Sequence, residues 1–200
     1  MPNIQCNDTD VLCPVNCAEA QIPTVSFDDC SPEINESEIE WIAIARSDAA
    51  DFLDIEDGTE WTTKIAQDAA EIQPTPDDSI RMIRVVGDKP APELQNRVVS
   101  GGRSLQTAKN HTINAEIDET NTDNYEFARS TSCNPTYKLW YITKAGLVYG
   151  GICGIKAQVI FNLIQNRGDG EIEKYVGTIT WKDRFDPPRA NFPLAGVVSF

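Results

Sequence analysis

The sequence predicts a mainly β protein of the α+β type, an antiparallel β-barrel or sandwich with one or two short flanking helices and extended terminal arms. Three observations indicate this fold. Residues 111–118 alternate apolar and polar side chains, which is the period of a half-buried strand. Residues 137–143 and 147–150 form an aromatic hairpin around a short turn. Two long strands, residues 155–164 and 172–182, follow on either side of a glycine-containing loop.

Shorter elements are predicted in the first half of the chain. Apolar alternation over residues 39–44 favours a strand. Residues 48–53 predict a short helix, and residues 59–67 predict a second one that is capped by Asp57 or Thr59.

Proline and glycine mark the connections. Residues 80–86 predict a strand, and it lies between proline-containing loops at 73–78 and 88–93, because proline lacks a backbone donor. Gly101 and Gly102 predict a further turn.

A helix and a core complete the expected domain. Residues 121–124 offer N-cap side chains for a helix over residues 125–130, which ends before Pro135. Six large apolar side chains are expected in the core: Trp140, Tyr141, Tyr149, Ile160, Ile179 and Trp181.

The chain divides by composition into three parts. Residues 1–32 form a cysteine-rich extended arm, residues 33–185 the barrel or sandwich domain, and residues 186–200 an extended tail. No apolar run approaches the roughly 20 residues that span a bilayer. The first residues lack the basic and apolar regions of a secretory signal, so we expect a protein made in a cytoplasm.

Charge is distributed unevenly along the chain. The formal net charge is −14; residues 1–100 hold 21 acidic and 6 basic residues, whereas residues 101–200 hold 10 and 11. The acidic half is either a solubilising surface or one that must not bind DNA, such as the wall of a DNA conduit. No basic aromatic stripe indicates specific nucleic-acid binding.

Four lysines in the second half suggest a mildly basic face that meets the acidic half of a neighbouring copy. They are Lys138, Lys144, Lys156 and Lys182.

Catalytic motifs are absent from the sequence. The single histidine, His111, stands at the start of a predicted strand without an obvious partner. There is no nucleophile elbow and no phosphate loop. The glycines of residues 150–154 predict a bulge or a close backbone contact. Residues 118–126 lack the glycine of a calcium loop and are better explained as a helix cap.

Acidic pairs are numerous, and none is singled out as a catalytic pair. They are Asp28/Asp29, Glu36/Glu38/Glu40, Asp54/Glu56/Asp57 and Asp77/Asp78. We therefore expect no enzyme activity and no cofactor.

Cysteines offer the one candidate metal site. Cys6, Cys13, Cys17 and Cys30 could hold zinc, form disulfides or remain free thiols, and paired Cys-x-x-Cys knuckles are absent. Cys133 and Cys153 are expected in the core or at the edge of the β-rich half.

The order of elements in residues 109–182 is distinctive. It comprises the strand 111–118, the helix at 124–129 (Asn-Tyr-Glu-Phe-Ala-Arg), the hairpin 137–151 and a strand pair that ends at 179–182 (Ile-Thr-Trp-Lys). This order resembles that of tail-tube and related virion proteins of tailed bacteriophages. The resemblance implies a barrel or sandwich subunit with a flanking helix and long arms that lock neighbouring copies into rings. The cysteine-rich arm departs from the usual pattern.

We therefore expect a structural virion protein that forms a homo-oligomeric ring or tube, contacts other virion proteins and conducts DNA through its lumen without binding it. It is expected to be made in the host cytoplasm and to have no membrane partner. Alternatives are a head–tail ring protein, a capsid-associated or decoration protein, or a β-sandwich receptor-binding module with exposed aromatics at one loop end. A small hydrolase that uses paired carboxylates is a third class.

Overall fold

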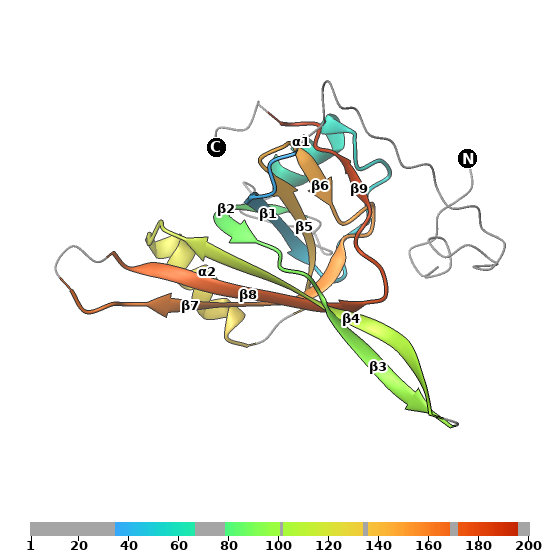
Figure 1. Ribbon diagram of the computed structural model, residues 1–200. Coiled ribbons are helices and arrows are strands. Elements are labelled where there is room, and N and C mark those ends of the chain that lie inside the picture. The colour runs from blue at the N-terminus through green and yellow to red at the C-terminus, as the bar shows by residue number, and fades with distance from the viewer. Residues whose placement is uncertain (1–34, 67–78, 101, 134–135, 169–171, 196–200) are drawn as a thin grey trace, which may run out of the picture. The chain divides into compact units, whose positions relative to one another are not determined.

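Six antiparallel strands close into a barrel in the computed structural model of the chain (Figure 1). The structure describes residues 35–66, 79–100, 102–133, 136–168 and 172–195. The chain divides into two units, residues 1–36 and 37–200, and the second unit contains the barrel. The predicted cysteine-rich arm and the loop at 73–78 lie outside the described residues.

Each barrel strand pairs with an antiparallel neighbour on either side. Around the barrel the strands are β1 (Ile39–Arg46), β2 (Arg81–Asp88), β4 (Arg103–Ile117), β8 (Lys174–Asp183), β7 (Ile155–Ile164) and β5 (Thr136–Thr143). The circle closes because β5 pairs with β1 along the whole length of β1. Closure decides the predicted choice between barrel and sandwich in favour of the barrel.

Alternate residues of each strand face the barrel interior and form one apolar core. In β7, the side chains of Ile155, Ala157, Val159 and Phe161 are buried, and the residues between them are exposed. Ile160 belongs to the exposed set and is 36% exposed, so the prediction that it lies in the core is wrong. The period of two places it on the outer face with its polar neighbours.

The other expected core residues divide between two clusters. Tyr141, Ile179 and Trp181 are buried inside the barrel, and Tyr149 is half-buried against that core. Trp140 is buried in a second cluster on the outer side of β1 and β5. The residues that were predicted to form one core therefore belong to two cores, which lie on opposite faces of β1 and β5.

A helix packs against the barrel beside β7. This helix, α2 (Thr122–Thr131), begins three residues before the predicted start at residue 125. Its cap comes from the predicted cap segment, because the Asn121 side chain accepts a hydrogen bond of 2.8 Å from the amide of Asn124. At its other end, the hydroxyl of Thr131 accepts a bond of 2.9 Å from the amide of Phe161. The helix thus supplies a partner to a backbone group of β7 that no strand reaches.

The second cluster is covered by one helix and two short strands. They are α1 (Gly58–Ala66), β6 (Leu147–Tyr149) and β9 (Arg189–Asn191). Aromatic rings pack edge to face within the cluster, and Trp61 lies 5.2 Å from Phe192 between ring centroids. Because β9 pairs with β6 and Phe192 is buried, the segment expected as an extended tail begins inside the barrel domain.

The glycine-rich segment after β6 closes around the ring of Trp140. The indole Nε1 donates a hydrogen bond of 2.7 Å to the carbonyl of Gly151. A Cβ at Gly150 or Gly154 would lie 2.6 or 2.7 Å from the same ring. The predicted close backbone contact is confirmed.

The helix predicted over residues 48–53 is absent, and turns take its place. The Lys138 ammonium donates to the carbonyl of Ala49, and the amide of Phe52 donates 2.9 Å to the carbonyl of Ile152. Tertiary partners therefore take backbone groups that a helix would need for itself.

Candidate functional site: an exposed arm and an open groove

A two-stranded ribbon projects from the barrel (Figure 1). β3 (Glu93–Val99) pairs with the first half of β4, whereas β8 pairs with β4 only from Lys109 onward. Residues 93–108, here called the arm, therefore lie beyond the barrel wall. The predicted turn is confirmed at its tip, where Gly102 has φ 72°.

The arm offers apolar and charged groups to solvent. Leu94 is 59% exposed and Val98 is 73% exposed. Arg97 is exposed too and makes no ion pair within the described residues. An isolated two-stranded ribbon is marginally stable in water, so a surface that covers the arm would stabilise it.

Sequence reasoning missed the strands of the arm although it found the turn. Both faces of β3 are exposed, so its residues carry no apolar period that separates an inner from an outer face. The signal that could have found the arm is the Gly-Gly turn followed by residues 103–110, which extend the predicted strand at 111–118 backward.

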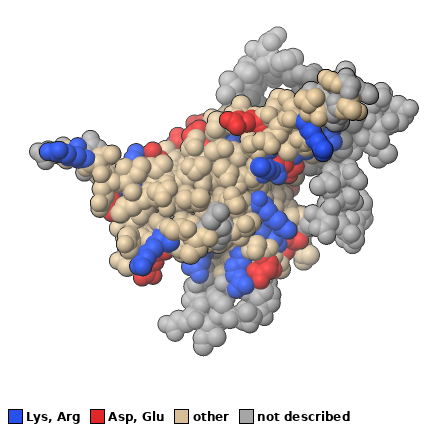
Figure 2. All heavy atoms as spheres, turned by 90° about the horizontal axis from the view of Figure 1, so that it is seen from below, with Lys and Arg blue, Asp and Glu red and all other residues tan. Residues whose placement is uncertain are grey.

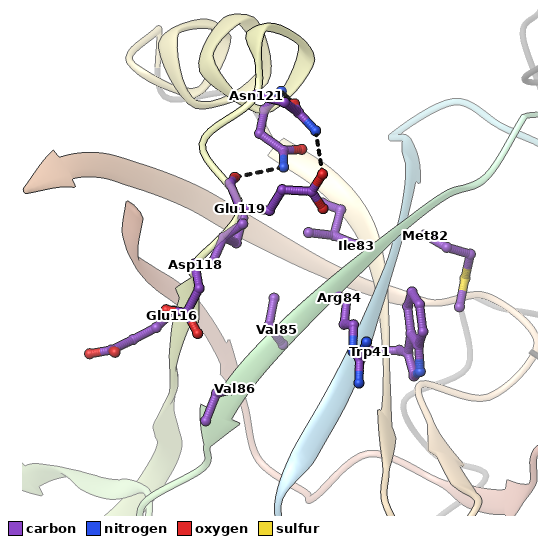
Figure 3. Close-up of a pocket in the computed structure, with 12 residues that line it drawn as sticks. Trp41, Met82, Ile83, Arg84, Val85, Val86, Glu116, Asp118, Glu119 and Asn121 are labelled. Atoms are coloured by element: carbon purple, nitrogen blue, oxygen red, sulfur yellow. Dashed lines mark hydrogen bonds between the residues drawn. The ribbon is translucent and has the colours of Figure 1, made fainter. Parts of the chain in front are cut away.

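A groove opens where β2 and β4 diverge (Figure 3). These two strands pair only over Val86–Asp88 of β2, so Met82 to Val85 have no partner in β4. The groove has a volume of about 540 Å³. Its lining comes from β1, β2, the end of β4 and the start of α2: Trp41, Met82, Ile83, Arg84, Val85, Val86, Glu116, Ile117, Asp118, Glu119, Asn121 and Asn124.

The two sides of this β2–β4 groove differ in charge. On the β2 side, the Arg84 guanidinium lies 3.7 Å from the Glu40 carboxylate and 6.0 Å from the Trp41 ring centroid. On the β4 side, Asp118 and Glu119 are exposed, and no described Lys or Arg pairs with either carboxylate. The β4 side is therefore an acidic rim, as the labelled side chains of Figure 3 show.

His111 is fully buried, and it lies within β4 and not at the start of a strand as predicted. Its ring stacks on Trp181 with centroids 5.0 Å apart. Neither ring nitrogen has a hydrogen-bond partner among the described residues. Burial, followed by the charge of Lys89, lowers the pKa of His111, so the ring is neutral near pH 7.

Asp186 fastens the chain over this barrel end. Its carboxylate accepts hydrogen bonds of 3.2 Å from Lys89 and 3.3 Å from Lys109, and it lies 3.7 Å from Nδ1 of His111. Burial acts to raise the pKa of Asp186, but the two lysines outweigh burial and lower it. These charges neutralise one another, so the cluster has a structural role.

Most of the net negative charge of the chain belongs to residues outside the described ranges. All 17 Lys and Arg residues fall within the described ranges, together with 19 of the 31 Asp and Glu residues. Figure 2 accordingly shows both signs side by side near the border of one face, around a broad uncharged centre. A single acidic field is therefore not a property of the described surface.

The four lysines of the expected basic face do not act together. Lys138 is buried and pairs with Asp51 at 2.5 Å, and Lys144 pairs with Glu38 at 2.8 Å. Lys156 and Lys182 are exposed on β7 and β8, and Lys144 is exposed in the turn before β6. The expectation of one basic face is wrong, because two of its members satisfy local carboxylates.

The described acidic groups serve turns, caps and ion pairs. Asp57 caps α1, as predicted, by accepting 2.8 Å from the amide of Thr59, and Glu56 accepts 3.0 Å from the amide of Asn191. Asp54 accepts 2.9 Å from the amide of Glu56. Neither of the two predicted acidic groups that the structure describes, Glu36/Glu38/Glu40 and Asp54/Glu56/Asp57, lines the β2–β4 groove. Asp28/Asp29 and Asp77/Asp78 lie outside the described residues.

The cysteines of the candidate metal site, Cys6, Cys13, Cys17 and Cys30, lie outside the described residues. Cys133 is an exposed free thiol after α2, so of the two predicted places, core or edge, the core is excluded. Cys153 is half-buried and disulfide-bonded. In the part of the chain that the structure covers, no three His, Cys, Asp or Glu side chains gather closely enough to hold a metal.

Among the described helices, none is both long and apolar enough to cross a bilayer. No protein-family model, curated protein or solved structure matches this chain.

Proposed function

We propose that the protein is a structural subunit that assembles with its own copies into a ring or tube. The observation that carries this proposal is the arm, a ribbon with exposed Leu94 and Val98 that extends past a closed barrel. A closed barrel needs no such extension to complete its own core. Exposed apolar side chains on a ribbon are stabilised when a second molecule covers them and removes their surface from water.

Assignment to a tailed-phage virion, as a tail-tube subunit, rests on the order of elements in residues 109–182. A barrel with one flanking helix and a long arm is compatible with that class of protein. DNA would pass through the lumen of such a tube. Because the described barrel is nearly balanced in charge, the acidic residues that repel DNA would come from outside the described ranges.

A head–tail ring or a capsid-associated protein uses the same parts and is the nearest alternative. A receptor-binding module has less support. It would present exposed aromatic side chains at one loop end, and Tyr125 on α2 is the one aromatic residue classed as exposed among those described.

Sedimentation velocity and negative-stain microscopy of the purified full chain test the proposal. We expect rings or tubes that appear as the protein concentration rises. A matched variant replaces residues 95–108 by an Asn-Gly turn, which joins the paired residues Leu94 and Lys109, shortens the arm and leaves the barrel strands in place. This variant should remain monomeric. A wild-type chain that stays a compact monomer at high concentration would refute the proposal.

A further inference from the structure

We propose that the β2–β4 groove receives the arm of a second copy of the chain, as an added strand beside β2. The proposal deepens the proposed function and rests on it, since it names the surface through which copies associate. Three observations support the proposal. β2 has an unpaired stretch, the exposed strand β3 can pair with that stretch, and the groove and the arm carry opposite charges.

The unpaired stretch belongs to β2. Residues 82–84 pair with β1 on one side and have no ladder partner in β4 on the other. Alternate backbone groups of a strand point to each side, so this edge offers donors and acceptors to an incoming strand. Ile83 is only partly buried although it faces the barrel core, because the wall is open beside it.

The incoming strand is β3. It pairs with β4 on one side only, so its outer edge has no strand neighbour among the described residues. Leu94 and Val98 lie four residues apart and share one face of β3, whereas Arg97 lies on the other face. An added β3 would turn its apolar face toward Ile83 and its arginine toward the acidic rim.

The charges of the two surfaces are complementary. Arg97 has no ion-pair partner within the described residues, and the same holds for Asp118 on the groove rim. Complementary charges across an interface fix its register and exclude wrong partners.

The arm cannot fill the groove of its own chain. β4 runs continuously from Arg103 at the arm tip to Ile117 beside the groove. Fourteen residue steps of a strand cover roughly 46 Å, so the tip points away from its own groove. The contact must join two copies, and an arm-to-groove contact that is repeated in one direction is heterologous and produces rings or filaments.

Charge reversal tests the pairing in the full chain. Arg97→Glu and Asp118→Arg each place like charges across the proposed contact, and we expect either variant to need about tenfold more protein for half-assembly. The double variant, and an equimolar mixture of the two single variants, restore opposite charges and should recover assembly. Arg167→Glu, at an exposed site in the β7–β8 loop, is the matched control and should assemble as the wild type does.

Three results overturn the inference. If the single variants assemble like the wild type, the inference is overturned and the proposed function is unaffected. Folded single variants that fail to assemble, with no recovery in the double variant or the mixture, would show that these residues act elsewhere. A wild-type chain that never assembles would remove both the inference and the proposed function.

Discussion

Gly177 in β8 is a position where one added methyl group should measurably destabilise the barrel. A Cβ at this residue would lie 2.3, 2.5 and 2.7 Å from three ring carbons of Phe161 on the neighbouring strand. Ordinary carbon contacts are about 3.5–4.0 Å, so in Gly177→Ala the ring must retreat by about 1 Å. Phe161 is 2% exposed and its ring lies 5.6 Å from that of Phe127, so the retreat disturbs packed atoms.

Two opposing effects determine the magnitude. Overpacking of a filled interior costs about 1–3 kcal/mol. Replacing glycine by alanine also restricts the unfolded chain, which stabilises the fold by about 0.4–1 kcal/mol where the site accepts the methyl group. The net loss in the free energy of unfolding for Gly177→Ala should be about 1–2 kcal/mol, or about 2–8 °C in Tm for a chain of this size.

Urea unfolding followed by tryptophan fluorescence measures the loss, with the arm-shortened chain used so that assembly does not contribute. A double-mutant cycle with Phe161→Leu isolates the cause, because the smaller side chain leaves room for the methyl group. Gly177→Ala should cost much less, or stabilise, in the Phe161→Leu background. An equal cost in both backgrounds would refute the reasoning, since the ring would then not be the obstacle.

Three further predictions concern a titrating ring, a buried cation and a helix cap. His111 is the one histidine of the chain, and its pKa is lowered in the fold. The unfolded state therefore binds the proton more readily than the folded state does. The contribution of His111 to the free energy of unfolding should be fully present above the unfolded pKa of about 6.5 and should decline as the pH falls below that value. His111→Phe, which keeps a ring beside Trp181, should flatten the stability profile between pH 7 and 5, and an unchanged slope would contradict this. Lys138→Met should lower the free energy of unfolding by about 2 kcal/mol, because the ammonium bonds a buried carbonyl and a carboxylate; chemical denaturation at several salt concentrations checks this, and a neutral result would contradict it. Asn121→Ala should cost about 1 kcal/mol through the lost α2 cap and Asn121→Ser much less, as measured by thermal unfolding.

Local patterns were sufficient for the strands that have one buried face. The alternation over residues 111–118 and the hairpin at 137–150 correspond to β4, β5 and β6. Tyr175, Ile179 and Trp181 are on one face of the strand predicted for them and are all buried. The Asn121 cap could be predicted because its side chain bonds a backbone group only three residues away.

Local patterns failed where distant partners decide. Residues 48–53 have helical propensity, yet Lys138, nearly ninety residues away, takes the carbonyl of Ala49. The arm is exposed on both faces, so no apolar period announces it. The groove exists only because β2 and β4 separate after three paired residues, and no property of either strand alone specifies that separation.

The aromatic hairpin and the two long strands show what the sequence determined by itself: a mainly β chain, the direction in which each strand turns its side chains, and the caps of both helices. These features depend on residues within a few positions of one another, and side-chain period is a local property. The tertiary structure alone decided that the sheet closes, that Trp140 lies in a second core outside the barrel, and that Arg97 and Asp118 stand on surfaces without partners. Each of those depends on which strands pair, and pairing joins residues that the sequence keeps far apart.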